Sequence, residues 1–159
     1  MKIYIASPLG FSESGREYLY NILIPKIIQK DCEVIDPWKL TDEELIKNVE
    51  SLELSIEKYN KWTEVNVIIG KNNVLGIEKS DGLLAVLDGP DVDSGTASEI
   101  GYAAALGKKI VGFRSDFRLA GDNIGSIINL QVEYFIKMTG GKIYNSIEDS
   151  ILELKALLN

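Results

Sequence analysis

Residues 83–87 are Leu-Leu-Ala-Val-Leu, an uninterrupted apolar run that the loop 88–92 (Asp-Gly-Pro-Asp-Val) terminates. Such a run, bounded by turn residues, is typical of a central parallel strand buried on both faces. A helix is expected next, over 94–106, with Gly107 closing it as a C-terminal cap. This strand–loop–helix unit indicates a parallel sheet, because parallel neighbours are joined by a crossover connection, usually helical.

The same alternation extends to both ends of the chain. Strands are expected over 2–6, 33–37, 83–87, 109–113 and 142–144. A first helix is expected from Ser12 or Ser14 to about Gln29, with a kink at Pro25. A second should run from the capping box 41–44 to about Tyr59, and a third over 61–79 with a break near Gly70. Further helices are expected over 94–106, 126–138 and 147–158. The predicted fold class is therefore α/β: one domain over 1–159, a doubly wound (flavodoxin-like or Rossmann-like) five-stranded parallel sheet with helices on both faces.

Composition narrows the possible partners and chemistry. The 159 residues carry 24 acidic and 17 basic side chains, a net charge of -7, so a nucleic-acid polymer is not an expected partner. One cysteine, Cys32, excludes an internal disulfide, and no apolar run approaches ~18 residues. A cytoplasmic protein without a membrane partner is expected. Because the chain has no histidine, carboxylates, tyrosines or backbone groups must do any chemistry, and no metal or cofactor is expected.

Topology alone indicates where a ligand would bind. In open α/β sheets ligands bind outside the carboxyl ends of the strands. That edge holds residues 7–10, 36–38, 88–96 and 114–116, and the richest segment, 88–103, contains four acids and three glycines.

Within this richest segment the functional and structural interpretations compete. Gly95 would let a ligand approach the backbone closely, and Glu99 lies beside the helix stripe that packs on the sheet. The alternative is structural: Thr96-Ala-Ser-Glu99 matches a capping box, and Asp93 could be an ordinary N-cap.

The segment 93–103, Asp-Ser-Gly-Thr-Ala-Ser-Glu-Ile-Gly-Tyr-Ala, resembles the signature of the nucleoside 2-deoxyribosyltransferase family. The opening 3–8, the segment 73–82 and the pair Asn129-Leu130 are similar to that family as well, in the same order. The resemblance implies an enzyme that transfers 2-deoxyribose between nucleobases. It would cleave the N-glycosidic bond of a 2'-deoxynucleoside through a covalent deoxyribosyl-Glu99 intermediate, with some hydrolysis.

The resemblance also implies roles for single residues. Glu99 would attack C1', Tyr4 would orient it, and Asp93 would bind the sugar near O5'. Asn129 would reach the sugar in a neighbouring subunit, so a homo-oligomer, a dimer or hexamer, is expected. The partners would be a 2'-deoxynucleoside and a free nucleobase. The remaining substrate-binding residues are expected to be Ser7, Pro8, Asn73, Asp88, Gly89 and Gly95.

Asn73 departs from the family pattern, because some members carry an acid there that contacts or protonates the base. The proton donor to the leaving base is therefore open, with four candidates in the edge segments: Asp36, Asp88, Asp91 and Asp116. Water is the alternative source of this proton.

Two other functions compete with the transferase. The first is an N-glycosidase acting on 2'-deoxynucleoside 5'-monophosphates, in which resembling members carry a serine in place of the sugar-binding acid. Asp93 would repel a phosphate dianion, which favours free nucleosides. The second is a non-catalytic nucleoside-sensing module, since doubly wound sheets host many functions. The presence of Tyr4, Asp93 and Glu99 together favours the enzyme.

Overall fold

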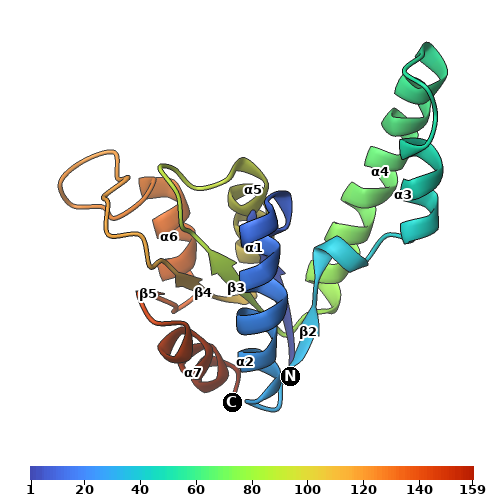
Figure 1. The fold of residues 1–159 in the computed structure, drawn as a ribbon. Coiled ribbons are helices and arrows are strands. Elements are labelled where there is room, and N and C mark those ends of the chain that lie inside the picture. The colour runs from blue at the N-terminus through green and yellow to red at the C-terminus, as the bar shows by residue number, and fades with distance from the viewer.

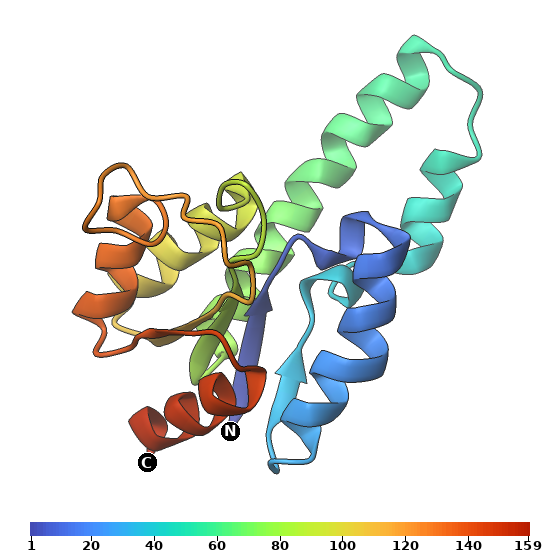
Figure 2. The same cartoon turned by 60° about the vertical axis from the view of Figure 1, so that its left-hand side comes forward.

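Five parallel strands form the central sheet in the order β2-β1-β3-β4-β5. The computed structural model describes residues 1–159, and Figures 1 and 2 show the sheet with helices packed on it. This order is that of flavodoxin-like folds, so the predicted fold class is confirmed. The strands are β1 (Lys2–Ala6), β2 (Glu33–Ile35), β3 (Gly82–Val86), β4 (Lys109–Phe113) and β5 (Ile143–Tyr144).

Two apolar layers sandwich the sheet, because side chains along each strand alternate between its faces. Leu83 and Ala85 of β3 belong to one core cluster, whereas Leu84 and Val86 belong to the other. The first cluster is covered by α4 (Ile56–Lys79), α5 (Ser94–Ala105) and α6 (Leu130–Met138). The second is covered by α1 (Glu13–Tyr18), the π-helical turn η2 (Leu19–Leu23), α2 (Ile24–Ile28) and α7 (Ile147–Leu158).

The helix expected from Ser12 to Gln29 is present, but its middle is irregular. Ser12 caps it, since its hydroxyl accepts a hydrogen bond from the Gly15 amide at 3.0 Å. The π-helical turn ends just before Pro25, which has no amide hydrogen for the regular helical ladder.

The expected helix from 41 to Tyr59 is wrong in its extent. In the structure this helix is the shorter α3 (Glu43–Glu50), and a turn separates it from α4. The Ser55 hydroxyl caps the start of α4 by accepting a hydrogen bond from the Lys58 amide. The predicted break near Gly70 is also wrong. A glycine in a helix costs only about 1 kcal/mol, which a helix of 24 residues can absorb. Helices α3 and α4 form an arm that projects from the body (Figures 1 and 2).

The helix expected over 126–138 begins later, at Leu130. The side-chain oxygen of Asn129 accepts hydrogen bonds from the Gln131 and Val132 amides at 3.1 and 3.3 Å, and so caps α6. Residues 114–129 form a long irregular loop (Figure 1). Gly107 does end α5 in the left-handed region, with φ of 71°. None of the helices has the length and apolar character needed to span a membrane.

Candidate active site

A pocket of about 280 Å³ lies where the carboxyl ends of β1 and β2 meet the start of α5 and the side of α4. The volume is slightly below the range of about 300–1,000 Å³ that is usual for small-molecule sites. Its wall combines carboxylates with aromatic and apolar side chains. The lining residues are Ser7, Phe11, Pro37, Trp38, Ile69, Asn73, Asp93, Gly95, Thr96 and Glu99.

The central polar contact joins Tyr4 of β1 to Glu99 of α5. The Tyr4 hydroxyl donates a hydrogen bond of 2.6 Å to Oε1 of Glu99, and the tyrosine is fully buried. Helix α4 can lie against this tyrosine because residue 76 is glycine. A Cβ atom on Gly76 would lie 3.1 Å from Cε2 of Tyr4 and 2.7 Å from Cδ1 of Leu40. Oε2 of Glu99 forms no hydrogen bond, so one carboxylate oxygen has no protein partner.

Asp93 is the N-cap of α5 and also lines the pocket. Its Oδ2 accepts hydrogen bonds from the amide and hydroxyl of Thr96 at 2.9 and 3.2 Å, while Oδ1 accepts none. The N-cap interpretation of Asp93 is therefore confirmed, and a free oxygen remains for a ligand. The capping-box interpretation of Glu99 is wrong, because α5 begins at Ser94 and Glu99 lies beyond its first turn.

The pKa values of Tyr4 and Glu99 are shifted by burial and by the interaction between the two side chains. Burial is the main cause that raises the pKa of Glu99, to about 7, and the charge of Asp93 raises it further, while the Tyr4 hydrogen bond opposes the rise. Burial, and then the charge of Glu99, raise the pKa of Tyr4 well above its usual value. Tyr4 thus stays a donor at neutral pH, whereas Glu99 titrates there.

Ser7, Asn73 and Gly95 join Asp93 and Glu99 in the pocket wall, as expected from the sequence. Pro8, Asp88, Gly89 and Asn129, also expected at the site, are not among the lining residues.

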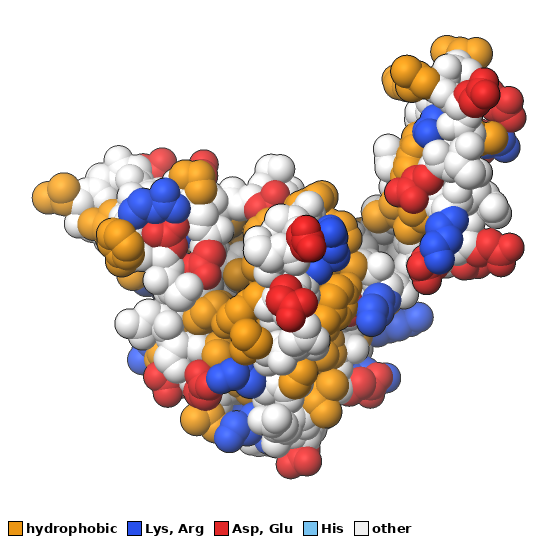
Figure 3. Space-filling view, in the orientation of Figure 1, with side chains coloured by type: hydrophobic (Ala, Val, Ile, Leu, Met, Phe, Trp, Pro, Cys, Tyr) orange, Lys and Arg blue, Asp and Glu red, His pale blue; other side chains and the backbone are white.

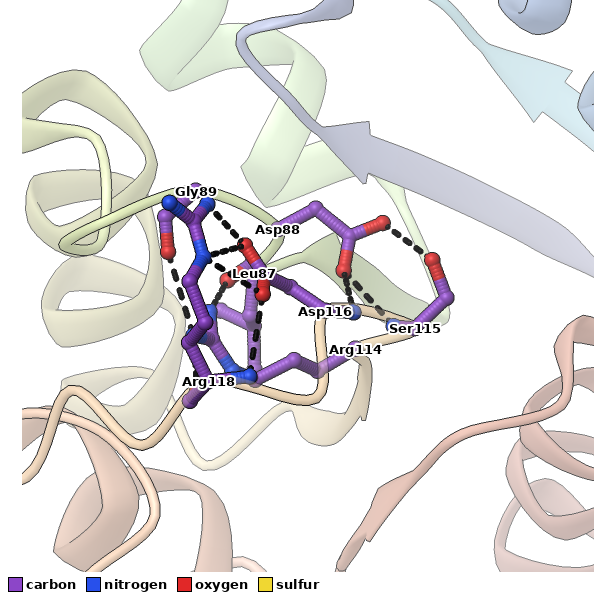
Figure 4. A network of polar contacts seen from close by, with 7 residues as sticks. All are labelled: Leu87, Asp88, Gly89, Arg114, Ser115, Asp116 and Arg118. Carbon is purple, nitrogen blue, oxygen red and sulfur yellow. Dashed lines mark hydrogen bonds and ion pairs between the residues drawn. The ribbon is translucent and has the colours of Figure 1, made fainter.

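Asp88 instead holds two loops together (Figure 4). Its Oδ1 accepts hydrogen bonds from the amides of Ser115 and Asp116 at 2.6 and 2.7 Å, and its Oδ2 accepts one from the Ser115 hydroxyl at 2.8 Å. The cause is register: Val86 pairs with Phe113, so the chain leaves both strands side by side. The buried Arg114 adds to this network by donating to the backbone carbonyls of Leu87, Gly89 and Arg118.

None of the four candidate proton donors lines the pocket. Asp116 binds the Arg118 side chain, and this contact holds its pKa far below the usual range, so it stays ionised. Asp91 is exposed and accepts a hydrogen bond from the Val92 amide. Asp36 is buried and is not a lining residue, and burial raises its pKa.

The sequence analysis did not single out the aromatic wall. Phe11 and Trp38 meet edge to face, with ring centroids 4.7 Å apart. A Cβ atom on Gly10 would lie 2.1 Å from Cε2 of Trp38, so only glycine lets the indole pack there. Trp38 belongs to an edge segment that topology had marked. Ile69 could not have been found, because its place depends on how α4 crosses the sheet.

The fold and the pocket define an α/β protein that holds a buried tyrosine–carboxylate pair at the edge where such sheets bind small molecules. Comparison with known families is specific: the model described as nucleoside 2-deoxyribosyltransferase matches residues 3–135. The chain therefore belongs to the nucleoside 2-deoxyribosyltransferase family. This family acts on nucleosides and nucleobases and points to a glycosyl-transferring or glycosidase enzyme.

Solved structures share the whole fold. A conserved protein from Enterococcus faecalis V583 superposes with a TM-score of 0.66 at 28% identity, covering 98% of both chains. A 2-deoxyribosyltransferase from Bacillus psychrosaccharolyticus has a TM-score of 0.61 at 22% identity, covering 99% of this chain and 96% of its own. A CMP N-glycosidase from Clostridium botulinum has a TM-score of 0.56 at 18% identity, covering 98% and 99%. The last two likenesses show the fold alone.

A curated relative matches only in part. An uncharacterised protein of Schizosaccharomyces pombe is 33% identical over 75 residues, which are 45% of this chain and 36% of that protein. The match thus spans about a third of that relative's length.

Proposed function

We propose that the protein transfers 2-deoxyribose between nucleobases by cleaving the N-glycosidic bond of 2'-deoxynucleosides, with some hydrolysis. The observation that carries this proposal is the Glu99 carboxylate, held in the pocket by the Tyr4 hydroxyl at 2.6 Å with its second oxygen free. Family membership supports the same reaction class.

The proposed reaction has two displacements at C1'. Oε2 of Glu99 forms a bond to C1' as the C1'–N bond breaks, and that electron pair leaves with the base, which takes up a proton from water. A ring nitrogen of a second base then attacks C1' from the opposite face, loses its N–H proton to water and releases the carboxylate, so configuration is retained overall. Water in place of the second base gives hydrolysis. Deoxyribose suits this route because no 2'-hydroxyl withdraws electrons from the cation-like transition state.

Tyr4 positions the nucleophile in this scheme. Its hydroxyl holds Oε1 of Glu99 by a hydrogen bond, and Oε2 is then available to the sugar. Because the pKa of Tyr4 is raised, the hydroxyl remains a donor while the carboxylate alternates between free and esterified forms. The unpaired Oδ1 of Asp93 would accept a hydrogen bond from the 5'-hydroxyl of the sugar.

The decisive experiment offers the protein one deoxynucleoside together with a different free base, followed by chromatography. Formation of a new deoxynucleoside is expected. Release of the base without exchange would favour a glycosidase, and deoxynucleoside 5'-monophosphates should be tested in the same way. No release from any of these compounds would contradict both enzymes and favour a nucleoside-sensing module.

The pH dependence of kcat/KM should report the state of Glu99. The nucleophile is the ionised form, so kcat/KM should rise with pH through about 7. Tyr4→Phe removes a hydrogen bond that lowers the pKa of Glu99, and should move the rise to higher pH. Asp93→Asn removes a like charge that raises it, and should move the rise to lower pH. Profiles measured between about pH 5 and 9 should therefore shift in opposite directions. Shifts in the same direction would contradict the assignment.

We propose further that the protein works as a homo-oligomer, a dimer or hexamer, in which Asn129 completes a neighbouring site. Only the side-chain oxygen of Asn129 is used to cap α6, so its amide hydrogens remain free to donate. Large apolar side chains are exposed on the arm and on the loop 114–129, as protein interfaces require, and Figure 3 shows apolar side chains at the arm's tip. These exposed residues include Leu54, Ile56, Phe117, Leu119 and Ile124.

Mixing two inactive variants tests this assembly. Glu99→Ala lacks the nucleophile, whereas Asn129→Asp keeps an N-cap acceptor and replaces the amide donor with a negatively charged oxygen. Mixed oligomers can combine one intact Glu99 with an intact Asn129 from its neighbour, so activity should return on mixing. A monomeric mass in sedimentation, or no recovery after subunit exchange, would contradict the proposal.

A further inference from the structure

Arg114 is a buried cation that holds backbone groups and no carboxylate. Its side chain is only 4% exposed, and it directly follows β4 at the sheet edge that holds the pocket. The guanidinium donates hydrogen bonds to three backbone carbonyls, while its buried Nε has no partner (Figure 4). The ion pair of this network joins Arg118 to Asp116 instead. Burial of a charge costs free energy, so a buried guanidinium without a carboxylate calls for an explanation.

The three carbonyls that Arg114 holds belong to two different loops. Those of Leu87 and Gly89 lie where the chain leaves β3, and Gly89 is bound at 3.1 Å. The carbonyl of Arg118, bound at 2.7 Å, belongs to the loop that follows β4. Arginine can span both loops because its rigid fork carries five N–H donors in fixed directions, whereas lysine gathers its donors at one point.

The loop that leads from β3 to Asp93 depends on this contact. Between Asp88 and Asp93, the Gly89 carbonyl is the one group that is hydrogen-bonded to another part of the chain. The Asp91 carboxylate bonds only to the adjacent Val92 amide, and Val92 is held by burial in the core. The path of the chain into Asp93 is therefore set by Arg114 at one end and by apolar packing at the other.

We propose that Arg114 is a positioning residue for Asp93: by holding the Gly89 carbonyl, it fixes the loop so that Oδ1 of Asp93 faces the 5'-hydroxyl of the sugar. This inference rests on the proposed function. Arg114 does not line the pocket, so its effect must pass through Asp93. Substrates that have a 5'-hydroxyl should therefore depend on Arg114, whereas substrates without one should not.

A pair of substrates tests this dependence. In wild type, kcat/KM should be at least about tenfold higher for deoxyadenosine than for 2',5'-dideoxyadenosine, equivalent to ~1.4 kcal/mol. Arg114→Lys keeps the charge but cannot hold both loops, so it should bring this ratio to within about threefold of one by lowering only the value for deoxyadenosine. A merely structural role would lower both values alike. In the Asp93→Ser background, Arg114→Lys should have no further effect on either substrate.

A second variant breaks the same contact from the other side. Gly89 has φ of 132°, and a Cβ atom there would lie 3.2 Å from the Asp91 carbonyl oxygen, so Gly89→Ala must move the loop while Arg114 stays intact. It should cause the same selective loss. Lys108→Met is the matched control, because Nζ of Lys108 holds the Glu78 and Ser80 carbonyls at 2.8 and 2.5 Å near the opposite edge of the sheet. It should leave the ratio unchanged.

Calorimetry in the Glu99→Ala background gives a readout that does not require turnover. Deoxyadenosine should bind more tightly than 2',5'-dideoxyadenosine, and Arg114→Lys should remove the difference. Equal losses for both substrates, or an unchanged ratio in both variants, would overturn the proposal and leave the transferase intact; if Arg114→Lys does not fold, Gly89→Ala decides. No preference for deoxyadenosine in wild type would also overturn it. Absence of turnover with every deoxynucleoside would instead overturn the proposed function, and the binding ratio would still decide the role of Arg114.

Discussion

Replacing Glu99 with alanine is expected to lower turnover of deoxynucleosides at least about a thousandfold, equivalent to ~4 kcal/mol of lost transition-state stabilisation. The side chain supplies the only pocket carboxylate that a buried tyrosine holds in place, and its second oxygen is free. Without it, no other group in the wall is held in the same way to attack C1' and store the sugar. Base release measured by absorbance or chromatography checks this result.

The Glu99→Ala variant should remain folded. Burial raises the pKa of Glu99 to about 7, so the ionised carboxylate costs stability as the pH rises through that value. Removing the group removes this cost, and a melting curve near pH 8 should show no loss of cooperative folding. Ser98→Ala is a matched control, because Ser98 is exposed on the same helix and bonds only to the Ser94 carbonyl.

Trapping of the intermediate gives a second measure of the same assignment. A 2'-fluoro-arabinosyl substrate should add the mass of its sugar to a peptide that contains Glu99. If the alanine variant keeps more than about 10% of activity, a loss of only ~1.4 kcal/mol, another residue is the nucleophile.

Free deoxynucleosides should exceed their 5'-monophosphates at least about a hundredfold in kcat/KM, equivalent to ~2.7 kcal/mol. The unpaired Oδ1 of Asp93 can accept a hydrogen bond from a neutral 5'-hydroxyl, but it repels a phosphate. Two unit charges 4 Å apart near a protein surface interact by about 4 kcal/mol, so this repulsion is large enough. Kinetics with deoxyadenosine and its monophosphate measure the ratio.

Asp93→Ser should narrow this gap at least about tenfold, because serine removes the charge. Serine is also a good N-cap, so α5 should persist. Activity on nucleosides should fall, since the longer-reaching acceptor is lost. Asp91→Ser makes the same charge change on an exposed neighbour in the same loop and should leave the ratio unaltered. A wild-type preference for monophosphates would refute the argument and favour the rival N-glycosidase.

The local pattern of the chain was sufficient to predict the α/β class, the five strands and the sheet edge that holds the pocket. These features depend on neighbours in sequence: the apolar run 83–87 requires burial on both faces, and Gly107 ends a helix because its left-handed backbone suits glycine. Asp93 as a cap and Glu99 near the ligand edge follow from the same short segment. Their catalytic roles came from family resemblance and remain predictions.

Only the tertiary structure decided which distant side chains meet. Tyr4 and Glu99 are 95 positions apart, and their contact requires the crossing of α5 over β1. The strand register that brings Asp88 to Ser115 diverts an expected ligand residue to a structural network. The sequence also could not predict that Oδ1 of Asn73 has no hydrogen-bond partner, whereas the adjacent Asn72 donates to Leu40 and Thr41. Helical spacing and capping depend on residues a few positions apart, whereas strand register and helix crossing are set by how whole elements pack.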